Sequence, residues 1–219
     1  FGQPRRKGEP LSHYHKDIAF AVQDSFEKAV ITIVKKMYQK TKLRNLCMAG
    51  GCALNCVTNM KLSKLDFIDN IYVQPAATDQ GLALGAALYG SSKAGIKPKA
   101  ISNYYLGSGY NNQDIKKSIK SCGAKYLSLK NKDISKLASE SLEKGKIIAL
   151  YQGRSEFGPR ALGNRSILAN PIISNIKDQI NKRIKFREEF RPFAPAVLEE
   201  FAKKVFSINN PSPFMTITS

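Results

Sequence analysis

The chain has 219 residues, with 35 Lys and Arg against 17 Asp and Glu, so its formal net charge is +18. Hydrophobic residues make up 42% of the sequence, which is enough for a packed core and excludes wholesale disorder and collagen-like or low-complexity classes. No run of about 18 apolar residues occurs, so we expect no membrane-spanning segment.

The first part of the chain predicts alternating helices and strands. Apolar residues at three- and four-residue steps predict a long helix over residues 15–42. Short apolar runs predict strands, and segments rich in Ala, Leu and Asn predict further helices. The expected order is strand 45–49, a Gly50-Gly51 turn, helix 53–64, strand 68–73 and helix 81–91. This order is typical of an α/β fold whose strands are buried on both faces.

The second part follows a Gly- and Asn-rich break. We place a first domain at residues 1–98, a linker at 99–111 and a second domain at 112–219. Within the second domain we expect helices at 112–120, 132–144, 174–183 and 199–205, strands at 146–152 and 165–170, and extended chain at 191–197. The apolar run at 214–218 predicts a last strand that lacks a following partner.

The cysteine and histidine residues favour neither zinc nor thiol catalysis. Cys47, Cys52, Cys56 and Cys122 form no CxxC pair, and both histidines, His13 and His15, lie far from them in sequence. Four thiols outside a small secreted scaffold fit a reducing cytoplasm, so we expect a cytoplasmic protein.

The charge indicates an anionic partner, such as nucleic acid or a phosphorylated small molecule. Most Lys residues are scattered at helix-like spacing, which is typical of a solvated surface. The Arg residues are concentrated between positions 154 and 191. Because the planar guanidinium group matches phosphate oxygens, this concentration is the stronger indication of an anion site.

Two turns in the first part are candidate sites. Gly50 and Gly51 stand between a strand and a helix, where free backbone N–H groups suit phosphate; a tight turn without ligand is the alternative. Asn55 follows in the expected helix. Asp79, after the next strand, is able to ligate a hard metal or simply to cap a helix, and its position alone favours the cap.

Two basic segments are the strongest candidates. Residues 153–166 combine Gly, Pro and Arg, and guanidinium groups held close together repel unless an anion joins them. Glu156 is expected to orient one of these arginines. Residues 181–193 add Lys185, Arg187 and Arg191, which are able to converge on the same anion; an exposed basic helix end is the alternative. For the two segments together we favour a phosphate site.

Four strings of this sequence together resemble the NodU/CmcH-type O-carbamoyltransferases, which act in nodulation-factor and antibiotic biosynthesis. The strings are GGCALNCVTNMKL, QPAATDQGLALGAALYG, GRSEFGPRALGNRSILANP and FREEFRPFAPAVL. The third is long and specific, and the resemblance runs from about residue 13 to residue 215.

The resemblance implies part of an actin-like ATPase (sugar-kinase-like) domain, followed by a YrdC-like α/β domain. It implies ATP and carbamoyl phosphate as co-substrates that form carbamoyl adenylate, then carbamoyl transfer to a hydroxyl of a sugar or antibiotic-like acceptor, helped by a divalent metal, iron or Mg. The residues that it would assign to nucleotide, phosphates and metal are Gly50, Gly51, Asn55, Arg154, Gly158, Arg160, Asn164, Arg165, Ser166, Lys185, Arg187, Arg191 and, for the metal, Asp79.

The chain departs from the family pattern in one respect. The family carries an HxxxH helix with metal-binding histidines, and no HxxxH occurs here, so other metal ligands would lie outside this chain. We therefore expect an internal fragment without transferase activity by itself. An RNA-binding or tRNA-modifying module is the alternative, but no RNA-binding motif is present and nucleic acid is not the expected partner. A structural remnant with a degenerate site is a third possibility, weakened because the Arg-rich motif is intact.

Overall fold

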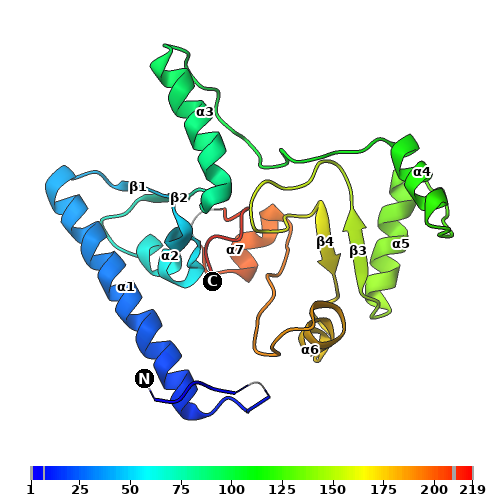
Figure 1. Cartoon of the computed structure of the whole chain (residues 1–219), viewed down its shortest axis with the longest axis horizontal. Coiled ribbons are helices and arrows are strands. Elements are labelled where there is room, and N and C mark those ends of the chain that lie inside the picture. Colours follow the sequence, from blue (N-terminus) through cyan, green and yellow to red (C-terminus); the bar gives the residue numbers. More distant parts are fainter. Residues whose placement is uncertain (1, 7, 209–210, 219) are drawn as a thin grey trace. The chain divides into compact units, whose positions relative to one another are not determined.

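The computed structural model describes residues 2–6, 8–208 and 211–218 of the chain. It forms two compact units: Phe1–Gln74 with Thr216–Ser219, and Pro75–Met215. In Figure 1 the first unit carries the long helix α1, and the second carries the strands β3 and β4. None of the helices in the described ranges is long and apolar enough to span a membrane. The domains expected at 1–98 and 112–219 remain predictions.

The first unit has the predicted order of elements. Helix α1 (His13–Thr41) is followed by strand β1 (Asn45–Met48), the 3₁₀ turn η1 (Gly51–Leu54), helix α2 (Cys56–Ser63) and strand β2 (Asn70–Val73). The helix expected from residue 53 begins only at Cys56. Asn55 caps it, because its side-chain oxygen accepts the backbone N–H of Thr58 at 3.1 Å.

The core of the first unit forms where α1, β1 and α2 meet. Val34 of α1, Leu46 of β1 and Leu62 of α2 are buried against one another. Burying each of these side chains contributes about 1.5–3 kcal/mol, so this contact is what holds the long helix to the strands. Seven partly buried side chains pack around the three: Val30, Ile31, Met48, Leu65, Phe67, Ile68 and Ile71.

The two strands of the first unit are parallel, with Leu46 opposite Ile71 and Met48 opposite Val73. The expectation that these strands are buried on both faces is wrong. Along β1, Leu46 is buried and Cys47 is exposed. Because successive side chains of a strand point to opposite faces, only one face of β1 packs on the core among the described residues.

The second unit contains the remaining predicted helices and the second pair of strands. Strands β3 (Ile148–Tyr151) and β4 (Arg165–Leu168) pair antiparallel, with Tyr151 opposite Arg165. The expected helix 174–183 is instead a short α-helix that continues as a π-helical turn. The other elements, in chain order, are η2 (Asp79–Gly81), α3 (Leu82–Lys93), α4 (Asn112–Ser121), α5 (Asn131–Glu143), α6 (Ile176–Ile180), the π turn η3 (Asn181–Lys185), η4 (Glu199–Phe201) and α7 (Ala202–Val205). The α/β class is confirmed.

The last strand expected at residues 214–218 is wrong. Met215 has a φ of 54°, in the left-handed region, which interrupts any extended backbone. The Phe214 ring packs edge-on against Tyr104, with centroids 5.3 Å apart. In the first unit, the carbonyl of Thr216 accepts a hydrogen bond from the buried amide of Asn59 at 2.8 Å. The apolar run is therefore held by side-chain contacts instead of a sheet partner.

A polar cluster joins α1 to α2 inside the first unit. Glu27 is buried, forms an ion pair with Lys61 and accepts a hydrogen bond from Gln23 at 2.8 Å. These hydrogen bonds, from Gln23 and then from Lys61, hold the pKa of Glu27 below its ordinary value, although burial acts in the opposite direction. The Gln23 amide also exchanges two hydrogen bonds with Asn55, at 2.8 and 3.2 Å. The cluster thus fixes the cap of α2 to the side of α1.

The lowered pKa of Glu27 predicts a pH dependence of folding. The carboxylate ionises more easily in the folded chain than in the unfolded chain, so its contribution is complete above the ordinary carboxyl range and is lost as pH falls through and below that range. We expect Glu27→Gln to lower the thermal midpoint at pH 7, and the difference from wild type to shrink between about pH 5 and pH 3. Glu140 of α5, which pairs with Lys136, offers the matched control variant Glu140→Gln, which should change little. A difference for Glu27→Gln that is constant with pH would contradict this assignment.

Candidate functional site

The Arg-rich segment forms the loop between β3 and β4. At its base, the backbone N–H of Gln152 donates to the carbonyl of Asn164 at 3.0 Å, and the Gln152 side-chain amide donates to the carbonyl of Gly163 at 3.1 Å. These bonds extend the ladder of the hairpin by one step. The loop therefore projects from a fixed base, and the residues between Gly153 and Gly163 lie beyond the sheet.

Glu156 lies within the loop and binds its backbone. One carboxylate oxygen, Oε1, accepts the N–H groups of Leu162 at 2.7 Å, Asn164 at 2.8 Å and Arg165 at 3.2 Å. Burial by itself would raise the pKa of Glu156, but these backbone donors outweigh burial and hold the pKa below its ordinary value. We expected Glu156 to orient an arginine; its observed partners are backbone amides.

The guanidinium groups of Arg154 and Arg165 donate hydrogen bonds to backbone carbonyls. Arg165 donates to the carbonyls of Gln152 at 2.6 Å, Asn164 at 2.9 Å, and Ser108 and Gly153 at 3.2 Å, and its guanidinium lies 3.6 Å from the centre of the Tyr151 ring. Arg154 donates to the carbonyls of Leu106 at 2.8 Å and Gly107 at 2.9 Å. Carbonyl oxygens thus satisfy these two cations where we expected an anion, although their positive charge remains in the loop.

Arg160 differs from the other two loop arginines. Its Nε is buried and has no hydrogen-bond partner among the described residues. A buried donor without a partner costs about 1–3 kcal/mol, so this position is ready to accept an anion. Asn164 and Ser166, by contrast, support the loop: the Asn164 amide donates to the Arg154 carbonyl at 2.7 Å, and the Ser166 hydroxyl accepts the N–H of Gly163 at 3.0 Å.

Gly158 brings the loop against the segment that leads to Asp79. Its φ is 131°, and a Cβ there would lie 3.0 Å from the carbonyl oxygen of Pro75. A side chain is therefore excluded by both conformation and space. Asp79 follows four residues after Pro75 and is exposed at the start of η2. The structure thus places the Asp79 segment beside the Arg-rich loop within the second unit.

The described residues do not complete a metal site around Asp79. They contain no group of three or more His, Cys, Asp or Glu side chains able to hold an ion. The side chain of His15 is occupied at the start of α1, where its Nδ1 accepts the Ser12 backbone N–H at 3.2 Å. The residues present therefore do not fit a metal by themselves, and we derive no chemical step through one.

The second basic segment folds around Asn181, which is fully buried. Its Oδ1 accepts from Arg187 Nε at 2.7 Å, and its Nδ2 donates to the carbonyls of Glu189 and Arg191 at 3.3 and 2.9 Å. Arg187 also donates to the Pro192 carbonyl at 3.3 Å. The side chain of Arg191 lies 3.9 Å from Glu188, and Lys185 is exposed. These bonds keep the segment together without linking it to the Arg-rich loop, so its convergence on a shared anion remains a prediction.

The predicted nucleotide-binding residues of the first unit differ from one another in whether they are free to contact a ligand. Gly50 and Gly51 are exposed at the start of η1, and a Cβ on either would meet no atom within 4 Å. Asn55 is committed to Gln23 and Thr58, as described above. The two glycines are thus accessible to a ligand, whereas the Asn55 side chain has a structural task.

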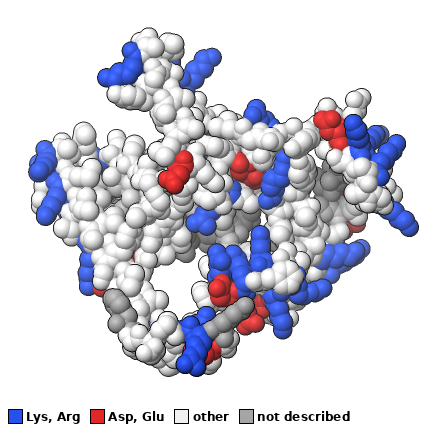
Figure 2. All heavy atoms as spheres, in the orientation of Figure 1, with Lys and Arg blue, Asp and Glu red and all other residues white. Residues whose placement is uncertain are grey.

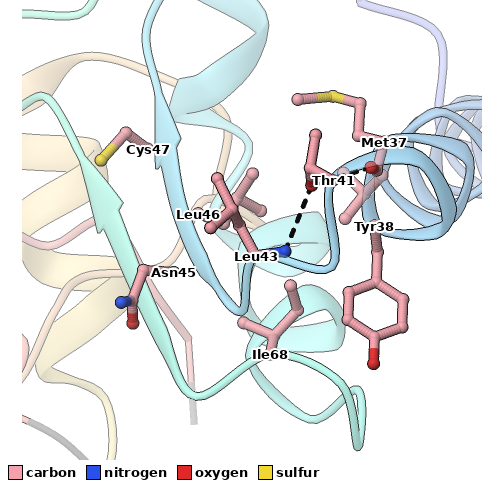
Figure 3. Close-up of a pocket in the computed structure, with 9 residues that line it drawn as sticks. Met37, Tyr38, Thr41, Leu43, Asn45, Leu46, Cys47 and Ile68 are labelled. Atoms are coloured by element: carbon pink, nitrogen blue, oxygen red, sulfur yellow. Dashed lines mark hydrogen bonds between the residues drawn. The ribbon is translucent and has the colours of Figure 1, made fainter.

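An apolar hollow lies elsewhere in the first unit. It has a volume of about 130 Å³ and sits between the end of α1 and strand β1 (Figure 3). Its wall contains no charged side chain; the lining residues are Val34, Met37, Tyr38, Thr41, Leu43, Asn45, Leu46, Cys47 and Ile68. At the end of α1, the Thr41 hydroxyl accepts a hydrogen bond from the backbone N–H of Leu43 and donates one to the Met37 carbonyl. The hollow therefore offers no chemistry for an anion.

The charge distribution separates scattered Lys from the Arg-rich loop. Figure 2 shows basic side chains standing outward over α4, where Lys116, Lys117 and Lys120 are exposed. Such side chains are typical of a solvated face. The loop arginines Arg160 and Arg165 are instead half-buried. The positive charge of these two arginines is therefore more confined in position than that of the exposed Lys residues of α4.

Sequence reasoning missed the contribution of residues 104–108, which we had placed within the linker 99–111. This segment runs beside the loop: the N–H of Gly107 donates to the Ser155 carbonyl at 2.9 Å, and that of Phe157 donates to the Tyr104 carbonyl at 2.7 Å. A Cβ on Gly107 would collide with the Ser155 hydroxyl. That glycine was the available signal, since a glycine outside a turn often marks close backbone approach.

Comparison with known proteins identifies the family. The model described as "Carbamoyltransferase N-terminus" matches residues 1–88, and the model described as "Carbamoyltransferase C-terminus" matches residues 139–219. The chain belongs to the carbamoyltransferase family.

The relatives agree with this family. Nodulation protein NolO of Bradyrhizobium diazoefficiens is 41% identical over 97% of this chain and 40% of its own length. Nodulation protein U of Rhizobium tropici is 38% identical over 78% of this chain and 28% of its own length. An uncharacterised protein of Synechocystis is 41% identical over the whole of this chain and 37% of its own length. The chain therefore spans two fifths or less of the length of these relatives.

The different bonding of Arg165 and Arg160 predicts different effects on stability. Arg165→Met keeps the apolar stem but removes donors to four carbonyls, so we expect a loss of about 1.5–3 kcal/mol in the free energy of unfolding. The matched variant Arg160→Met removes no hydrogen bond and should leave stability unchanged or slightly raised. Urea denaturation of the two variants checks this. Equal losses at both positions would contradict the assignment of Arg165 to the scaffold.

Proposed function

We propose that this chain is part of an ATP-dependent O-carbamoyltransferase. In this proposal, carbamoyl phosphate and ATP form carbamoyl adenylate, and the carbamoyl group passes to a hydroxyl of a sugar or antibiotic-like acceptor. The two family matches support carbamoyl transfer in general. The partly buried Arg-rich loop, with an unpaired donor on Arg160, supports the use of phosphorylated co-substrates.

The loop suits this chemistry for an electrostatic reason. Carbamoyl phosphate and ATP bring several negative charges together, so they react only where cations offset the repulsion and fix the geometry. Arg154 and Arg165 are locked by carbonyls and supply fixed positive charge without moving. Arg160 keeps its Nε available. Charges that are already oriented need little reorganisation when the ligand arrives, which is the basis of electrostatic catalysis.

The finer assignments belong to the same proposal. They are an actin-like ATPase part followed by a YrdC-like part, nucleotide contacts at Gly50 and Gly51, phosphate contacts at Lys185 and Arg191, and a cytoplasmic location. A divalent metal held by Asp79 would need further ligands beyond the described residues, because these contain no metal-binding cluster.

The observation that carries the proposal is the unpaired donor of Arg160, and its test is direct. We expect isothermal titration calorimetry to show carbamoyl phosphate binding to the wild-type chain. Removal of a charged hydrogen-bond donor should cost about 1.5–3 kcal/mol, so Arg160→Ala should weaken binding about 10- to 100-fold.

A matched control separates the site from general charge. Lys117→Ala also removes one positive charge, but Lys117 is exposed on α4 and outside the proposed site. It should bind carbamoyl phosphate as the wild type does, after allowance for a small screened effect. Equal weakening by both variants would show a diffuse charge effect and would refute a specific site at Arg160.

A second prediction concerns turnover. We expect no carbamoyl transfer to a hydroxyl acceptor by the 219-residue chain alone, because its described residues lack a metal cluster and it spans two fifths or less of the relatives' length. Incubation with ATP, carbamoyl phosphate and candidate acceptors, followed by mass spectrometry, measures this. Robust turnover would show that the chain holds a complete transfer site.

A further inference from the structure

Glu156 is an acidic residue within the loop that carries Arg154, Arg160 and Arg165. It is half-buried at the centre of the Arg-rich loop, where it accepts hydrogen bonds from the backbone N–H groups of Leu162, Asn164 and Arg165. We propose that Glu156 is the positioning residue of the anion site: its carboxylate binds three backbone N–H groups and thereby holds Arg160 in place. This inference rests on the proposed function.

The three amides around Glu156 Oε1 form a site that an anion would otherwise occupy. The N–H groups of Leu162, Asn164 and Arg165 converge on one oxygen at 2.7–3.2 Å. Successive backbone N–H groups that point to one place are a common way to bind phosphate. Here the protein supplies its own anion. A phosphate ligand therefore cannot use these three donors, whereas the Nε of Arg160 has no partner among the described residues.

The connection from Glu156 to Arg160 is short and fixed at both ends. Only five residues separate Glu156 from Leu162, whose N–H it binds. Near the start of this stretch, the N–H of Phe157 donates to the Tyr104 carbonyl at 2.7 Å, and Gly158 packs against Pro75. Arg160 thus lies in a span anchored before and after it. The Tyr105 hydroxyl also holds this second anchor, because it donates to the Leu162 carbonyl at 2.9 Å. Loss of the Glu156 bonds would weaken the anchor and widen the range of positions open to the Arg160 guanidinium.

Freedom of this kind weakens binding without unfolding the protein. A ligand that must order a mobile loop has a lower affinity, because the lost conformational entropy opposes binding. The base of the loop is also held independently of Glu156, since Arg165 and Arg154 donate to backbone carbonyls there. The effect of Glu156 is therefore expected on ligand affinity and local amide protection more than on global stability.

The test combines amide hydrogen exchange by NMR with binding of carbamoyl phosphate. In Glu156→Ala we expect the amides of Leu162, Asn164 and Arg165 to exchange at least about tenfold faster and the affinity for carbamoyl phosphate to fall at least about tenfold. Loss of the three hydrogen bonds also lowers the urea midpoint, but the variant stays folded under the conditions of the binding measurement. Glu156→Gln keeps an acceptor without the charge, so both effects should be smaller but parallel. Glu143→Ala removes an exposed acid at the end of α5 and should change neither.

The possible outcomes distinguish a positioning role of Glu156 from a purely structural role. Faster exchange with wild-type affinity, in either variant, overturns the positioning role, and so does unchanged exchange in both variants. A loss of affinity that is fully explained by the fraction of the variant unfolded in the titration would show a structural role only. If Glu156→Ala does not fold, Glu156→Gln alone carries the test: parallel losses support the proposal, and their absence overturns it.

A second ligand keeps this test separate from the proposed function. Inorganic pyrophosphate presents the same phosphate chemistry without the carbamoyl group. If the wild-type chain binds pyrophosphate but not carbamoyl phosphate, the proposed function fails, and the effect of Glu156→Ala on pyrophosphate affinity still decides the positioning role. If it binds neither, both proposals are overturned.

Discussion

The carboxylate of Glu156 accepts three backbone N–H groups, and the part of the Arg-rich loop that carries Arg160 depends on this interaction. A loop of Gly, Pro and Arg has few apolar side chains to bury, so its shape must come from hydrogen bonds. Glu156 accepts hydrogen bonds from backbone N–H groups of the loop, and Arg165 donates hydrogen bonds to four backbone carbonyls. Both residues act on the backbone, one on its donors and the other on its acceptors.

This division explains why three arginines occupy so short a segment. Guanidinium groups held close together repel, and the sequence suggested an anion as the remedy. In the structure, carbonyl oxygens satisfy Arg154 and Arg165, and one negative charge, that of Glu156, is built into the loop. Arg160 is left with a buried Nε that has no partner in the described part of the chain. The loop thus contains a scaffold and, within it, one donor available for a ligand.

The first unit shows the same use of a buried carboxylate. Glu27 pairs with Lys61 and accepts from Gln23, which in turn holds Asn55 at the start of α2. A buried charge without such partners would be costly, so the cluster fixes how α1 lies on α2. Both units therefore use an acid, whose pKa is lowered by its donors, to position a turn.

The sequence by itself determined the α/β class, most element positions and the family, because apolar periodicity and long motifs are local properties of the chain. It also located the Arg-rich loop. It could not tell which arginines bind carbonyls, since the partners of Arg154 and Arg165 include residues 106–108, which lie 47 to 57 positions earlier. The strand expected at residues 214–218 failed for a related reason: an apolar run forms a strand only where a partner is present, and Thr216 instead meets Asn59. The tertiary structure alone decided these pairings, because hydrogen-bond partners distant in sequence are set by the fold.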